Sequence, residues 1–169
     1  MKIYKQMMFL AFSFIILSCS ETSQEDLIKK AEAPLLDGMG IHTHKVTTNR
    51  ASQKYFNQGL ILSFAFNHAE SIRSFKAAQR LDPNCAMCYW GEALSRGPNI
   101  NVTSDGKVVM SPQDRKDAFK AIEKAKELMS SVSAKEQDYI LALSSRYNGE
   151  IGTDRSDLDM NYALAMEAL

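Results

Sequence analysis

The chain has 169 residues, with 20 Lys and Arg against 20 Asp and Glu, so its formal net charge is zero. That length fits one domain of ordinary size, and a chain without basic excess is poorly suited to neutralising phosphates, which argues against nucleic-acid binding. Only 8 Gly and 4 Pro occur among many Ala, Leu, Lys and Glu residues. This composition disfavours an all-β or disordered chain and favours an all-α fold.

The N-terminus is typical of a bacterial secretion signal. Two early lysines precede an apolar run at Met7–Leu17, which is shorter than the roughly 20 residues that a membrane-spanning helix needs. The run ends in Ile16-Leu17-Ser18-Cys19, which resembles a lipobox, where the cysteine is lipid-modified and becomes the mature N-terminus. We expect a lipoprotein signal peptide over residues 1–18 and a lipid anchor on Cys19. An ordinary signal peptide with an incidental cysteine is the alternative.

A polar segment follows the signal. It runs from Ser20 to about Gly40 and contains an Ala-Glu-Ala-Pro stretch. Such a composition is typical of a linker, so residues 19–40 are predicted to be a flexible tether between membrane and domain. The helical repeat domain is then expected over residues 41–169.

Apolar residues recur at helical spacing from Ala51 onward. The apolar positions between Tyr55 and Phe66 predict one helix, and those between Ile72 and Leu81 predict a second. Asn67 and His68 separate the two, and Asp82-Pro83-Asn84 ends the pair. A helix pair closed by a proline, about 34 residues long, is the tetratricopeptide unit.

A second unit begins 34 residues further on, with Ala93 in the place of Gly59. Its second helix is delayed by an insertion near residues 97–113. A third pair is expected at Glu136–Tyr147 and Leu158–Leu169. Three pairs are enough for a stable stack, so the predicted architecture is an all-α tetratricopeptide-repeat superhelix. Because the third pair has no closing proline, we interpret the chain as an N-terminal piece of a longer array.

Several motifs resemble a family of bacterial envelope tetratricopeptide-repeat proteins of unassigned activity. They are Phe66-Asn-His-Ala-Glu70, Asp82-Pro-Asn-Cys-Ala-Met-Cys-Tyr-Trp-Gly91 and Gly97-Pro-Asn-Ile-Asn101. The resemblance covers about three quarters of the chain. It implies a helical repeat fold in the cell envelope and further repeats beyond Leu169, and it supplies no reaction.

Helix geometry sorts the unusual polar residues into two groups, one at each end of the helices. Cys85 and Cys88 begin the first helix of the second repeat, and His42 and His44 precede the equivalent helix of the first repeat. These four residues are predicted to meet, as a His2Cys2 site for zinc or copper. A disulfide or redox-active dithiol between the cysteines, or two inert buried thiols, are the alternatives.

The second group is expected at the opposite end, where the turn at His68 approaches the insertion. We expect a polar pocket formed by Asn67, His68, Glu70, Asn99 and Asn101. The alternative is that these residues cap helices and fix turns. The aromatic residues Tyr55, Phe56, Phe64, Phe66 and Phe75 are predicted to pack in the core.

The function that these features favour is a membrane-tethered scaffold. Paired repeat helices form a groove that receives a protein or peptide, and the lipid provides the membrane contact. A metal-handling or thiol-redox protein that uses the C-x-x-C and H-x-H motifs is the second hypothesis. An enzyme whose active site lies beyond Leu169 is the third. The expected location is the bacterial envelope, in a periplasmic or outer-membrane leaflet.

Overall fold

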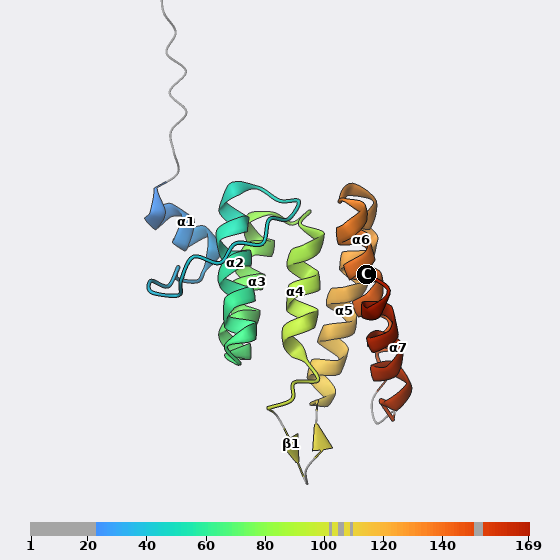
Figure 1. Cartoon of the computed structure of the whole chain (residues 1–169). Coiled ribbons are helices and arrows are strands. Elements are labelled where there is room, and N and C mark those ends of the chain that lie inside the picture. The colour runs from blue at the N-terminus through green and yellow to red at the C-terminus, as the bar shows by residue number, and fades with distance from the viewer. Residues whose placement is uncertain (1–22, 102, 105–106, 109, 151–153) are drawn as a thin grey trace, which may run out of the picture.

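The computed structural model describes residues 23–169 except 102, 105–106, 109 and 151–153, and in this part the helices stand side by side (Figure 1). The expected all-α class is confirmed. A short antiparallel pair of two-residue strands interrupts the helices between α4 and α5. In chain order the elements are α1 (Gln24–Ala31), α2 (Arg50–Phe64), α3 (His68–Leu81), α4 (Ala86–Arg96), β1 (Thr103–Ser104), β2 (Lys107–Val108), α5 (Pro112–Leu128), the 3-10 turn η1 (Met129–Ser131), α6 (Ala134–Ser144) and α7 (Ser156–Glu167).

Local side-chain caps explain where most helices begin. The residue before each of α1 to α6 accepts a hydrogen bond from a backbone N–H of the first turn, which satisfies a donor that the helix itself leaves unpaired. These caps are Ser23, Asn49, Asn67, Cys85, Ser111 and Ser133. In contrast, α7 follows Arg155, whose side chain makes no capping bond.

Phe75 joins the first helix pair to the second. Its side chain is fully buried and meets Phe56 edge-on, with 5.5 Å between ring centroids. A Cβ added at Gly59 would lie 2.9 Å from the Phe75 ring, and one at Gly91 would lie 2.2 Å from it. Both distances are shorter than van der Waals contact, so the ring fits only because both facing positions are glycine.

Successive helices pack on one another along the chain, and α4 also contacts α2 and α6. Trp90 of α4 reaches α6, where its indole Nε1 donates a 3.0 Å hydrogen bond to the carbonyl of Tyr139. The two rings also meet edge-on, with centroids 6.1 Å apart. The first helices of the three pairs therefore form a continuous row in the order α2, α4, α6.

The segment predicted as a flexible tether is ordered from Gln24 onward, which corrects that expectation. Helix α1 packs on α3, with Leu27 and Ala31 buried. The guanidinium of Arg80 donates to the carbonyl of Ala31, and the Tyr55 hydroxyl donates to Ala33 over 2.6 Å. The polar composition indicated a linker, but an eight-residue helix can dock with only a few apolar side chains, which a mostly polar segment still supplies. Residues 19–22 lie outside the described residues.

Residues 44–49, called here the strap, cross the end of the stack where α4 and α6 begin. The backbone N–H and hydroxyl of Thr47 donate to the two carboxylate oxygens of Glu136, over 2.6 and 2.7 Å. Thr48 and Asn49 both donate to Oδ2 of Asp82, which follows α3. The strap thus links the first helix pair to the third.

Candidate functional site

Cys85 and Cys88 form a disulfide at the start of α4. Both residues are fully buried, and the Ser52 hydroxyl lies 3.4 Å from Sγ of Cys88. The sulfur of Cys85 also accepts the N–H of Cys88, so it caps the helix. Among the alternatives from the sequence, the structure therefore contains the disulfide.

The predicted metal set of His42, His44, Cys85 and Cys88 is not assembled. His42 is exposed on the loop before α2, and the ring of His44 lies beside Phe56, with centroids 6.3 Å apart. No group of three or more His, Cys, Asp or Glu side chains placed to hold a metal occurs in the described part of the chain. The physical reason is that both sulfurs are bonded to each other inside the core, while the imidazoles belong to a surface segment.

The second group of predicted residues does come together in part. His68, the first residue of α3, donates from Nε2 to Oδ1 of Asn101 over 2.9 Å, which confirms that the turn approaches the insertion. Asn99 lines the same hollows as His68, and its side-chain amide donates to the carbonyl of Ser95 in α4 over 3.0 Å. His68, Asn99 and Asn101, with the side chains around them, are called here the turn-end site.

Asn67 and Glu70 have other partners. Asn67 caps α3 by accepting the N–H of Glu70. The Glu70 carboxylate pairs with Arg73 over 2.7 Å, one turn further along the same helix. The expected five-residue pocket is therefore corrected to three residues, because the first turn of a helix directs alternate side chains away from one another.

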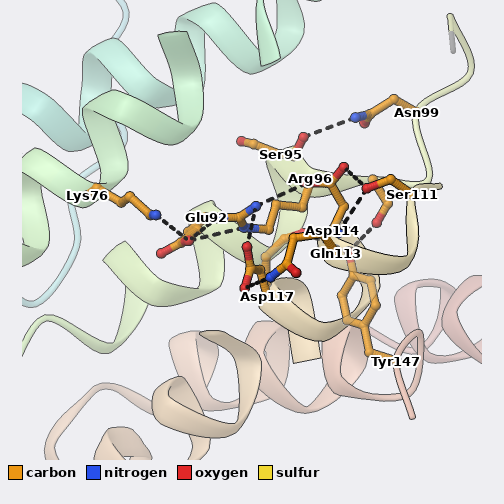
Figure 2. Close-up of polar contacts among 12 residues, drawn as sticks. Lys76, Glu92, Ser95, Arg96, Asn99, Ser111, Gln113, Asp114, Asp117 and Tyr147 are labelled. Atoms are coloured by element: carbon orange, nitrogen blue, oxygen red, sulfur yellow. Dashed lines mark hydrogen bonds and ion pairs between the residues drawn. The ribbon is translucent and has the colours of Figure 1, made fainter. Parts of the chain in front are cut away.

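A partly buried ion cluster fixes the base of the insertion (Figure 2). Arg96, at the end of α4, pairs with Glu92 over 2.8 Å and with Asp114 and Asp117 of α5 over 3.0 and 3.2 Å. Burial by itself would lower the pKa of the Arg96 guanidinium, but its bonds to Glu92 and the nearby aspartates outweigh burial and raise it. The Arg96 guanidinium therefore stays charged, and its ion pairs tie the start of α5 to α4.

The start of the insertion is held from the other side by the end of α6. The buried hydroxyl of Tyr147 donates to the carbonyls of Ala93 and Gly97, and Arg146 donates to that of Pro98 over 3.0 Å. Burial raises the pKa of the Tyr147 hydroxyl above its ordinary range, so it stays a donor. Residues 97–99 are thus clamped between α4 and the segment that follows α6, which fixes the backbone that carries Asn99.

Two hollows adjoin the turn-end site, and His68 and Asn99 line both. The larger, about 500 Å³, is bounded by α3, the end of α4 and the start of α5. The smaller, about 170 Å³, is bordered by Phe64, Phe66 and Ile100. The polar residues of the site therefore lie between two kinds of surface. Charged Arg96 and Asp114 line the larger hollow, and the apolar side chains of Phe64, Phe66 and Ile100, called here the apolar rim, border the smaller one.

The apolar rim is the part that sequence reasoning missed. Phe64 and Phe66 were expected in the core, yet they are 74% and 55% exposed, and Ile100 is 75% exposed. The reason is that α2 ends at Phe64, and Phe66 occupies a turn with φ of 61°. One signal in the sequence indicated this. Asn67-His68 marks the start of the next helix, so Phe66 falls in the turn before it and outside both helices.

Two predictions concern residues that the structure does not describe. The signal peptide over 1–18 and the lipid-bearing Cys19 both lie outside the described residues. Among the helices that are described, none is long and apolar enough to cross a bilayer.

Comparison of the chain with protein-family models, with curated proteins and with solved structures gave no match.

Proposed function

We propose that this chain is a lipid-anchored tetratricopeptide-repeat protein of the bacterial envelope, and that it binds a peptide segment at the turn-end site. The repeat assignment is supported by three consecutive helix pairs and by the row of α2, α4 and α6. The 34-residue offset between Gly59 and Ala93 agrees with the length of that unit. The anchor is supported by the lipobox-like residues that end at Cys19.

The observation that carries the binding proposal is the exposed rim. Phe64, Phe66 and Ile100 keep more than half of their surface in water and border one small hollow. Grouped apolar side chains of this size on a surface mark interaction sites, because leaving them hydrated costs free energy that a partner recovers. The clamped backbone of residues 97–99 limits the ordering that binding would require.

The chemistry of the site fits a peptide. Asn99 and Asn101 each use one amide atom within the chain, on Ser95 and His68. Their other amide atoms, the Asn99 oxygen and the Asn101 nitrogen, match the hydrogen-bonding groups of a peptide backbone, and the rim accepts an apolar side chain. Arg146 lines the smaller hollow, but its guanidinium already donates to Pro98, lies 3.5 Å from Asp159 and stacks on Tyr162. A ligand recognised mainly by its negative charge is therefore a poor match.

A larger hollow of about 620 Å³ lies along α3, α4 and α5, and it is less suited to this role. Its charged lining is largely paired, as in Lys76 with Glu92 and Lys124 with Glu127. A partner would have to break these pairs before making its own, which reduces the net gain.

Selection of peptides from a displayed random library on the detergent-solubilised full chain tests the proposal. We expect selected peptides to carry an apolar anchor residue and to lose at least about tenfold in affinity in Phe66→Ser, Ile100→Ser protein, by fluorescence anisotropy. The matched control is Leu141→Ser, Leu164→Ser, which removes two similarly exposed apolar side chains on α6 and α7. Selected peptides that bind both variants equally would contradict the proposal.

A further inference from the structure

The loop between α1 and the strap, residues 35–43, carries the most exposed large apolar side chain in the described part of the chain. Ile41 is 99% exposed and Leu36 is 41% exposed. This segment is called here the N-terminal loop, and it lies with α1 at the end of the stack beside α2 (Figure 1). Leu36 and Ile41 border one hollow together with Met39, and grouped apolar side chains on a surface mark interaction sites.

Both stems of the N-terminal loop are fixed to α2. On one side, Gln58 donates to the carbonyl of Pro34 over 3.1 Å and accepts the N–H of Leu36 over 2.8 Å. On the other, Asn57 accepts the N–H of His44, and Gln53 donates to the His44 carbonyl over 2.9 Å. The loop tip is therefore presented in a defined direction.

The distance from the loop to a lipid on Cys19 is short. Four residues lie between Cys19 and Gln24, and the five extended steps from one to the other span at most about 18 Å. From Gln24 onward, α1 is docked on α3 through Leu27 and Ala31, so no further slack is available. A lipid on Cys19 therefore brings this end of the stack close to the membrane surface.

We propose that the N-terminal loop is a membrane contact, and that Leu36 and Ile41 enter the interface of the bilayer that holds the lipid anchor. This rests on the lipid anchor of the proposed function. Apolar side chains buried in the interface add to the anchoring that a single acylated cysteine provides. The turn-end site is built on other residues, at the end of α2 and the turn to α3, and is not part of this contact.

Charge plays little part in this contact. Four lysines are exposed on α1, the strap and the part of α2 that borders the loop, namely Lys29, Lys30, Lys45 and Lys54. Four acidic residues are exposed on α1, directly after it and in the loop, namely Glu25, Asp26, Glu32 and Asp37. Opposite charges so closely mixed give no net attraction to anionic lipids. The contact is therefore expected with zwitterionic phosphatidylcholine and is insensitive to salt.

An environment-sensitive fluorophore on a single introduced cysteine tests the proposal in the full lipidated protein, reconstituted in phosphatidylcholine vesicles that contain nitroxide-labelled lipid. Ile41→Cys places the probe on the loop. Ile100→Cys is the matched control, because Ile100 is a similarly exposed isoleucine, 75% accessible, at the turn-end site. Cys85 and Cys88 are bonded to each other and buried, so they do not react.

We expect the probe at position 41 to emit at shorter wavelength and to be quenched by the nitroxide lipid, equally at low and high salt, while the probe at position 100 emits as in water. Equal behaviour at the two positions overturns the membrane contact. Incorporation of a labelled fatty acid into the same protein, and its loss in Cys19→Ala, is measured in parallel. Absence of that label overturns the anchor of the proposed function, and with it the contact, whereas a labelled protein whose position 41 reports water overturns the contact alone.

A second pair of measurements separates the native side chains from the effect of the probe. The unlabelled Leu36→Ser, Ile41→Ser chain is expected to fold as the parent does, because both side chains are exposed. With the Cys19 lipid retained, it is expected to transfer between vesicle populations several-fold faster than the parent. Unchanged transfer would overturn the contact.

Discussion

The first and last helices of the row differ in how they pack. Helix α1 covers α3 and buries Leu27 and Ala31, whereas α7 buries none of its residues. The exposed side chains there include Met160 and Leu164, at 60% and 56%. Helix α1 has a capping serine and α7 has no side-chain cap. The two ends of the same stack therefore differ in both packing and hydrogen bonding.

This difference shows how unevenly a row of similar helices is stabilised. A helix within a stack is stabilised by packing against neighbours on two sides, and a helix at the edge packs against neighbours on one side. Helix α7 relies on polar contacts, such as the 3.2 Å pair between Arg155 and Asp159 and the stacking of Arg146 on Tyr162 at 4.8 Å. Contacts of this exposed kind contribute little, so stability is expected to fall from α1 towards α7.

The largest expected effect is the loss of the cover that α1 provides. Leu27→Ala removes a side chain that is 93% buried, and we expect it to lower the free energy of unfolding by about 3 kcal/mol. Leu36→Ala, in the neighbouring loop, is the matched control and is expected to change it by less than about 0.5 kcal/mol. Urea denaturation followed by circular dichroism measures both. Equal effects would show that α1 does not stabilise the stack.

The next effect concerns the disulfide at the start of α4, the first helix of the second pair. Cys85→Ala, Cys88→Ala opens a very short loop, so we expect a loss of about 2 kcal/mol in the free energy of unfolding. Because both cysteines are fully buried, thiol titration of the native protein should detect neither, and should detect both after unfolding with reductant. Reactive thiols in the folded protein, or stoichiometric zinc lost in the double variant, would instead favour the metal or redox hypothesis.

The third prediction concerns the strap, which connects the first helix pair to the third through Glu136. Burial alone would raise the pKa of the Glu136 carboxyl, but hydrogen bonds from Ser133 and Thr47 outweigh it and lower the pKa. A depressed pKa means that this carboxylate stabilises the fold above its unfolded pKa, near 4.3, and that the contribution is lost as pH falls through the folded pKa.

Glu136→Gln is therefore expected to lower the free energy of unfolding by about 2 kcal/mol at pH 7, and by progressively less as the pH falls below about 4. Glu127→Gln is the control, because Glu127 is exposed and pairs with Lys124, one turn away on the same helix, over 2.7 Å. Denaturation curves at several pH values measure both variants. A cost for Glu136→Gln that does not depend on pH would mean that the carboxylate's charge is unimportant.

Much of this fold follows from local signals in the sequence. Caps such as Asn49, Asn67 and Ser133, together with apolar spacing, place the helices within a few residues of where they occur. The approach of His68 to Asn101 also followed, because helix lengths determine which turns share an end of the stack. Periodicity and capping are properties of neighbouring residues, so one sequence is enough to detect them.

The features that the sequence did not predict depend on contacts between residues far apart in the chain. The docking of α1 requires Arg80 and Tyr55, which lie 49 and 22 residues from their acceptors. The exposure of Phe64 depends on where the neighbouring helices stop, which its apolar character does not reveal. The pairing of Cys85 with Cys88 was one alternative among several, since oxidation, metal binding and burial all suit the same spacing.

The smallest expected effect lies at the far end of the stack. Leu164→Ala shortens a side chain that is already 56% exposed on α7, so we expect it to change the free energy of unfolding by less than about 0.5 kcal/mol. The comparison with Leu27→Ala is direct, because both changes remove the same atoms from a helix at an edge of the stack. Denaturation at two protein concentrations tenfold apart completes the test. A cost near 3 kcal/mol that grows with concentration would show that a second copy covers α7 in solution, and the contrast between the two ends would then belong to the monomer alone.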